Sequence, residues 1–103
     1  MKKILLVLIL TIFCQSAMAT TGSGLTIKSI YYCGDDFSMA MSNGERWVVR
    51  KADVGEQKLN HFISMAMYMV ATDKKTMNVF PKEPISWCGN QGVRPITIFS
   101  FQN

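Results

Sequence analysis

The chain has 103 residues and a formal net charge of +4, and 49% of its residues are hydrophobic. This length allows one modest domain and excludes two. Lys2 and Lys3 belong to a predicted leader, so the eleven basic residues fall to nine against seven acidic ones, a charge of about +2. A charge this small, without a Lys/Arg cluster, excludes the electrostatic footprint of a nucleic-acid-binding protein.

The first 19 residues have the order of a secretory signal peptide. A basic start (1–3) is followed by an apolar run (4–13) and by small residues that end at Ala19. We predict cleavage after Ala19, which leaves 84 residues in a secreted or periplasmic location. The apolar run is about half of the roughly 20 residues that a membrane-spanning helix needs, so we expect no membrane anchor after cleavage.

Two of the three cysteines belong to the mature chain. Cys14 leaves with the signal peptide, while Cys33 and Cys88 reach compartments in which disulfides form and persist. Only one pairing is possible within one chain, so we predict a Cys33–Cys88 disulfide. Closing a loop of about 55 residues restricts the unfolded chain by roughly 4 kcal/mol. A reactive or metal-bound thiol pair is the alternative.

The N-terminal half of the domain (25–103) predicts a three-stranded meander. Residues 20–24 lack apolar periodicity and are predicted to form a flexible leader. Residues 25–33 then predict a strand with Leu25, Ile27, Tyr31 and Cys33 on one face. Residues 37–42 predict a second strand, with Phe37, Met39 and Met41 toward the core. Asn43-Gly44 predicts a tight hairpin to a third strand at 45–50.

The next segment changes to helical periodicity. Between residues 55 and 75, apolar side chains recur at steps of three and four residues, which predicts an amphipathic helix. Its predicted buried face consists of Leu59, Phe62, Ile63, Ala66, Met69 and Val70.

After the helix, apolar and polar residues alternate again. Residues 76–80 predict a fourth strand, Pro81 and Pro84 interrupt the chain, and residues 85–88 are expected in a loop. Residues 93–101 predict a fifth strand, in which Pro95 indicates an edge or a bulge.

The predicted order β-β-β-α-β-β defines a mainly β fold with one helix. A five-stranded, partly open Greek-key barrel of the OB-fold type satisfies this order, with the helix over one mouth and the disulfide tying the first strand to the last. An α+β sheet with one packed helix is the alternative.

The sequence shows no catalytic or metal-binding constellation and implies no cofactor. His61 is the only histidine and has no ligand-type neighbour at suitable spacing, and Asp35-Asp36 is typical of a turn. We therefore predict a protein that is not an enzyme. Residue types that stack on sugars or anchor interfaces are present, although most are expected in the core or beside the disulfide: Tyr31, Tyr32, Trp47, Trp87 and Arg94.

Several motifs resemble those of secreted OB-fold proteins related to the binding (B) subunits of subtilase cytotoxin and the pertussis-like toxins. They are a first strand ending in cysteine (Ile30-Tyr31-Tyr32-Cys33), a Trp-containing strand, a helix Leu59-x-x-Phe62-x-x-x-Ala66 running into residues 74–79, and Cys88-Gly89 followed by residues 93–98. The resemblance covers most of residues 25–101. The chain is shorter than these subunits and lacks a second cysteine pair.

The resemblance implies an OB-fold that binds a host glycan and assembles into a homopentamer through edge strands. No sugar-contacting residue of these subunits can be placed on this sequence, so the ligand-binding residues stay unknown at this stage. We expect a secreted or periplasmic binding protein that recognises a glycan or a partner protein. The alternative is a monomeric envelope or periplasmic protein with a structural or inhibitory role, which binds another protein through a strand edge.

Overall fold

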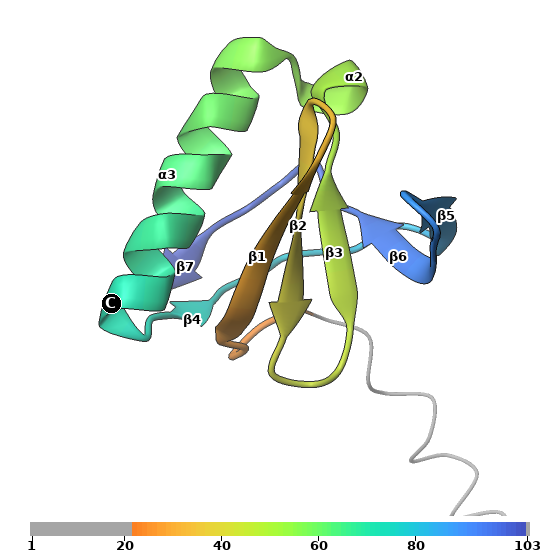
Figure 1. Cartoon of the computed structure of the whole chain (residues 1–103). Coiled ribbons are helices and arrows are strands. Elements are labelled where there is room, and N and C mark those ends of the chain that lie inside the picture. The colour runs from red at the N-terminus through yellow and green to blue at the C-terminus, as the bar shows by residue number, and fades with distance from the viewer. Residues whose placement is uncertain (1–21, 103) are drawn as a thin grey trace, which may run out of the picture.

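A computed structural model describes residues 22–102, so the predicted signal peptide lies outside the described residues. The described chain is mainly β with one main helix, and a mixed five-stranded sheet has the order β1-β2-β3-β6-β5 (Figure 1). Neighbouring strands are antiparallel except β3 and β6, which are parallel. The strands are β1 (Ile27–Cys33), β2 (Asp36–Met41), β3 (Arg46–Val49), β5 (Ile85–Trp87) and β6 (Asn90–Pro95).

A bulge changes the face that β1 presents to the core. The register between β1 and β2 shifts between Ile27 and Ser29, where β1 carries one extra residue. Ile27 and Ile30 consequently pack against the main core, whereas Cys33 packs against a second cluster on the opposite face. The prediction of one strictly alternating apolar face along this strand is wrong, because the bulge reverses the alternation.

The predicted hairpin between β2 and β3 is confirmed, with a three-residue loop. Gly44 donates its N–H to the Met41 carbonyl at 3.0 Å, and Met41 donates its own N–H to the Glu45 carbonyl at 2.8 Å. Gly44 has a φ of 91°, the left-handed conformation that glycine adopts without strain. This is a type I turn followed by a left-handed residue, a common three-residue hairpin loop.

The predicted helix is confirmed as α3 (Glu56–Thr72), and a four-residue helix, α2 (Lys51–Val54), precedes it without having been predicted. α3 ends where Asp73 takes a left-handed φ of 58° and donates its N–H to the Met69 carbonyl. The buried residues of α3 were all predicted: Leu59, Phe62, Ala66 and Met69.

Val70 is a correction to that predicted face, because its side chain is 46% exposed. It follows Met69 directly, and one residue turns the side chain by roughly 100° around a helix of 3.6 residues per turn. Since Met69 points into the core, Val70 points past it toward solvent.

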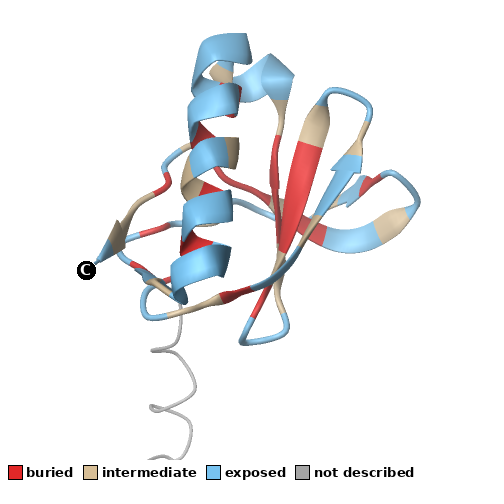
Figure 2. Ribbon diagram, turned by 60° about the vertical axis from the view of Figure 1, so that its left-hand side comes forward, coloured by how far each residue is buried: buried red, intermediate tan, exposed pale blue. Residues whose placement is uncertain are grey.

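Apolar side chains pack on both faces of the sheet. The main cluster joins α3 to the face that carries Phe37, Met39 and Met41, the three β2 residues predicted to face the core. Figure 2 shows buried positions on α3 turned toward buried positions on the strands, with exposed positions outside. The smaller cluster, on the other face, contains Val48, Trp87 and Val93. Burial of such side chains stabilises the fold by about 1.5–3 kcal/mol each.

The chain after α3 contains shorter strands than predicted. The fourth strand is reduced to β4 (Lys75–Thr76), since Asn78 has a φ of 56° and leaves the extended conformation. Residues 85–88, predicted as a loop, contain β5. The long fifth strand is replaced by β6 and by β7 (Phe101–Gln102), which pairs with β4 in a separate two-stranded sheet.

Pro95 lies at the end of β6, a strand in the interior of the sheet, rather than at a sheet edge. Ile96 donates its N–H to the Val48 carbonyl at 2.9 Å directly after it. Pro95 has no backbone N–H to donate, but it is the last residue of β6, and the strand pairing ends there.

Residues 22–24, predicted as part of a flexible leader, are held against the segment after β4. Gly22 donates its N–H to the Val79 carbonyl at 2.8 Å, and Gly24 donates to the Thr76 carbonyl at 2.7 Å. The Thr76 hydroxyl donates to the Gly22 carbonyl at 2.5 Å. The predicted flexibility therefore does not hold for these three residues, while the rest of that leader lies outside the described range.

The disulfide between Cys33 and Cys88 is present and joins the two edges of the sheet. Cys33 ends β1, Cys88 lies in the turn between β5 and β6, and their Cα atoms are 6.4 Å apart. β1 and β5 are the outermost strands, and no strand pairing joins them within residues 22–102. The sheet is open, so a closed OB-fold barrel is not confirmed.

The helix α3 lies alongside β1 rather than over one mouth of a barrel (Figure 1). Within residues 22–102, no helix is both long enough and apolar enough to span a membrane.

Candidate ligand-binding site

A hollow of about 710 Å³ lies beside the disulfide. The turn between β1 and β2, the start of α2 and the end of β5 meet there. The disulfide brings these distant segments together, so their side chains converge on one place. The hollow is lined by Cys33, Gly34, Asp35, Asp36, Lys51, Ala52, Trp87 and Cys88.

The Asp36 carboxylate fixes the geometry of this hollow. Its Oδ2 atom accepts a hydrogen bond from Trp87 Nε1 at 3.1 Å, and its Oδ1 atom accepts one from the Lys51 backbone N–H at 2.9 Å. The Lys51 N–H is one of the donors that the first turn of a helix leaves unsatisfied. Asp36 thus ties β2 to both α2 and β5, and both of its oxygens already have partners.

Aromatic rings border the hollow. Trp87 is 7% exposed, and Tyr31 packs edge-on against it, with ring centroids 5.8 Å apart and an interplanar angle of 88°. Tyr31 is 48% exposed and lies on the same face of β1 as Cys33, whereas Tyr32 lies on the opposite face, where its ring packs against Phe37 of the main core. The Tyr31 and Trp87 rings offer flat apolar surface, and the Tyr31 hydroxyl offers a hydrogen bond.

Asp35 and Lys51 supply the accessible charges of the hollow, because both residues are exposed. A free carboxylate accepts hydrogen bonds from hydroxyl groups, and an ammonium group donates them. Together with the aromatic border, the hollow can hold a ligand with one apolar face and several hydroxyl groups.

Two of the residues that the sequence suggested for binding have other roles. Trp47 is fully buried and donates its Nε1–H to Glu45 at 2.9 Å. The Arg94 guanidinium donates to the carbonyls of Lys82 and Pro81 at 2.8 and 2.9 Å, which holds that loop. Tyr32 packs against Phe37 on the other face of β1, so the structure brings only Tyr31 and Trp87 together beside the disulfide.

Sequence reasoning missed Asp35, Asp36 and Lys51 as site residues. The two aspartates were predicted to form a turn, and they do lie at or next to the connection between β1 and β2. The available signal was their distance of two and three residues from Cys33, which places them beside any disulfide that Cys33 forms.

His61 and Ser64 lie about one turn apart on α3, where His61 is exposed and the Ser64 hydroxyl donates to the Asn60 carbonyl. The Ser100 hydroxyl donates to the Met77 carbonyl. In the part of the chain that the structure describes, no group of three or more His, Cys, Asp or Glu side chains is placed to hold a metal ion.

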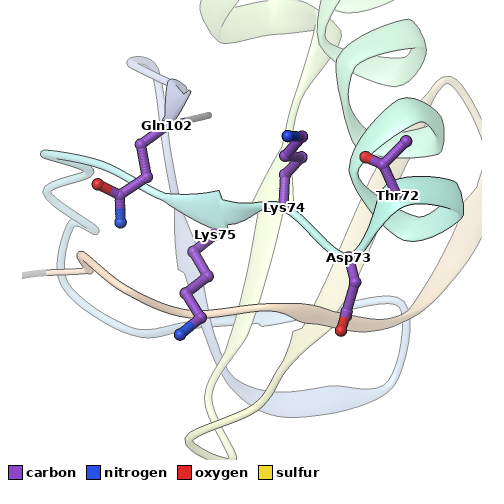
Figure 3. Close-up of a pocket in the computed structure, with 5 residues that line it drawn as sticks. All are labelled: Thr72, Asp73, Lys74, Lys75 and Gln102. Atoms are coloured by element: carbon purple, nitrogen blue, oxygen red, sulfur yellow. The ribbon is translucent and has the colours of Figure 1, made fainter.

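A second hollow, of about 340 Å³, lies between the end of α3 and the β4–β7 sheet (Figure 3). It is lined by Thr72, Asp73, Lys74, Lys75 and Gln102. Lys74 and Lys75 point in opposite directions (Figure 3), so their ammonium groups do not converge on one anion. No aromatic side chain lines this hollow, whereas Trp87 lines the hollow beside the disulfide.

No protein family, curated protein or solved structure matches this chain.

We predict that Asp36→Ala lowers the free energy of unfolding by about 2 kcal/mol, because it leaves the Trp87 indole N–H and the Lys51 N–H without acceptors. Urea denaturation followed by tryptophan fluorescence measures this change. Asp35→Ala is the matched control, since this neighbouring carboxylate is exposed, and its effect is expected within about 0.5 kcal/mol. Equal losses in both variants would contradict the role given to Asp36.

Proposed function

We propose that this protein is an exported, non-enzymatic binding protein with an OB-fold-like architecture, similar to toxin B subunits, and that the hollow beside the disulfide binds a glycan. The observation that carries the proposal is the convergence of Trp87, Asp35 and Lys51 in one open hollow, bordered by the exposed Tyr31 that packs on Trp87.

The fold gives coarse support. Three antiparallel strands precede the main helix, and two further strands after it complete the five-stranded sheet, an order that is compatible with an OB-fold. The disulfide brings the two sheet edges together at one end, as partial closure of a barrel requires. A disulfide also suits a chain that leaves the cytoplasm.

The chemistry of the hollow suits a sugar. A pyranose ring has an apolar face that packs on aromatic side chains, and its rim of hydroxyl groups pairs with carboxylates and ammonium groups. Trp87 and Tyr31 supply the aromatic surface, while Asp35 and Lys51 supply the polar contacts. The position of Trp87 is fixed by Asp36, so this wall of the hollow is formed before any ligand arrives.

A glycan array probed with the processed, oxidised protein tests the proposal. We expect binding to a restricted set of glycans, and Asp35→Ala is expected to weaken it about tenfold or more, because hydrogen bonds to a charged group contribute about 1.5–3 kcal/mol. Glu83→Ala, which removes an exposed carboxylate outside the hollow, is the matched control and should bind like the unmodified protein.

The proposal fails if the array is silent for the folded protein, or if Asp35→Ala and Glu83→Ala bind equally well. Thermal unfolding of each variant shows that a lost signal reflects lost contacts rather than a lost fold.

A further inference from the structure

Exposed apolar side chains gather on β1 and α3. Among the described residues, the exposed large hydrophobic side chains on the α3 side of the sheet at these two elements are Tyr32, Met67 and Val70, whereas Tyr31 packs against Trp87 on the opposite face and Tyr68 packs against Phe101. A shallow groove of about 300 Å³ runs between the elements, lined by Ser29, Ile30, Met67, Val70 and Ala71. Gathered apolar surface of this kind indicates contact with another molecule.

The same place carries the longest free strand edge of the sheet. β1 has seven residues and, within the described chain, pairs only with β2. The other outer strand, β5, has three residues and adjoins the disulfide turn. An unpaired strand edge is a template for pairing with another chain.

We propose that β1 and the adjoining side of α3 form a homodimer interface, in which β1 of each copy pairs antiparallel about a two-fold axis at Ile30. The two sheets then continue into one another. The groove of one copy then lies next to the groove of the other, because both copies place α3 on the same face of the joined sheet.

The hydrogen-bonding pattern of β1 fits this register. Met41 directs its N–H away from β1, toward Glu45, so by alternation the neighbouring Ala40 faces β1 and pairs with Ser29. The peptide groups of Ile30 and Tyr32 then point outward. Ile30 of one copy meets Ile30 of the other with these outward groups facing each other.

The charges of β1 favour a second copy of this chain as the occupant. Lys28 is the only charged residue in the strand. Lys28 lies in the bulge between Ile27 and Ser29, so in the register centred on Ile30 the lysines of the two copies lie at opposite ends of the paired stretch. The pairing of β1 with a second β1 therefore brings no two like charges together.

The apolar groove adds side-chain contact to this strand pairing. Met67, Val70 and Ala71 lie on the side of α3 next to β1, and the two-fold axis brings them toward the same residues of the second copy. The small side chain of Ala71 allows close approach of the two helices.

The free strand edges of the sheet suit a dimer better than the ring of five copies that the toxin resemblance implies. A ring joins two different surfaces of neighbouring copies, whereas a two-fold dimer uses the same surface twice. Among the described strands of the main sheet, β1 provides a long free edge and β5 only three residues.

Sedimentation equilibrium of the exported, oxidised protein tests the proposal with two matched variants. Met67→Lys places a charge in the groove, and Met77→Lys makes the same change at an exposed methionine outside it. We expect the unmodified protein and Met77→Lys to form dimers. Burying one ammonium group per copy in Met67→Lys is expected to raise the dimer dissociation constant about 100-fold.

Circular dichroism verifies that both variants are folded, which is expected because both methionines are exposed. A monomer at high concentration, a pentamer, or a dimer that Met67→Lys does not weaken more than Met77→Lys would each overturn the proposal. A monomer that captures an extended peptide along β1 would point to a different protein as the occupant.

Discussion

Replacing Cys33 and Cys88 together by serine is expected to lower the free energy of unfolding by about 4 kcal/mol, the cost of releasing a loop of this length in the unfolded chain. The melting temperature should fall by roughly 20 °C for a domain of this size. Differential scanning calorimetry measures both quantities.

Cys14→Ser is the control for this experiment, because Cys14 lies in the predicted signal peptide and should be absent from the mature protein. Its mature product is expected to melt like the unmodified protein. An unchanged melting temperature in the double variant would refute the stabilising role of the disulfide.

The disulfide also shapes the proposed binding site. Without it, β1 and β5 are no longer tied at their ends, although the Trp87–Asp36 hydrogen bond still connects β5 to β2. We therefore expect the hollow to widen before the rest of the sheet unfolds, since nothing else in the described chain is covalently linked across it.

Gly22→Val is expected to lower the free energy of unfolding by about 3 kcal/mol, through overpacking of the core. A Cβ atom on Gly22 would lie 2.6 Å from Trp47 Cη2 and 2.9 Å from the Val79 carbonyl oxygen. Trp47 is fully buried and the carbonyl belongs to the backbone, so neither can move freely. Urea denaturation of the oxidised protein measures the loss.

Ser23→Ala is the matched control in the same segment. Ser23 is exposed, and its hydroxyl accepts one hydrogen bond, from the Asn78 N–H at 2.9 Å. We expect this variant to lose about 0.5 kcal/mol or less. If Gly22→Val were equally mild, residues 22–24 would not belong to the folded core.

Local patterns predicted the first half of the fold well. The hairpin at Asn43-Gly44 and the helix around Phe62 follow from neighbouring residues, because turn chemistry and helical periodicity are short-range signals. The disulfide followed from counting the cysteines that remain after the predicted cleavage.

The parts that sequence reasoning missed depend on distant contacts. β5 is a strand because β6 pairs with it. The parallel pairing of β3 with β6 has no corresponding pattern in the sequence of either strand. The bulge near Ser29 comes from an extra residue that period-two counting cannot detect. Asp36 became a site residue only when Trp87, 51 residues away, was placed beside it.

The contacts of β4 have a consequence for when the protein can fold. Thr76 is bonded to Gly22 and to Leu25, and it pairs with Phe101. This corner of the core therefore closes only when three segments that are far apart in the sequence are available at the same time. While the segment that carries Phe101 has still to be synthesised the corner stays open, so it is completed late in folding.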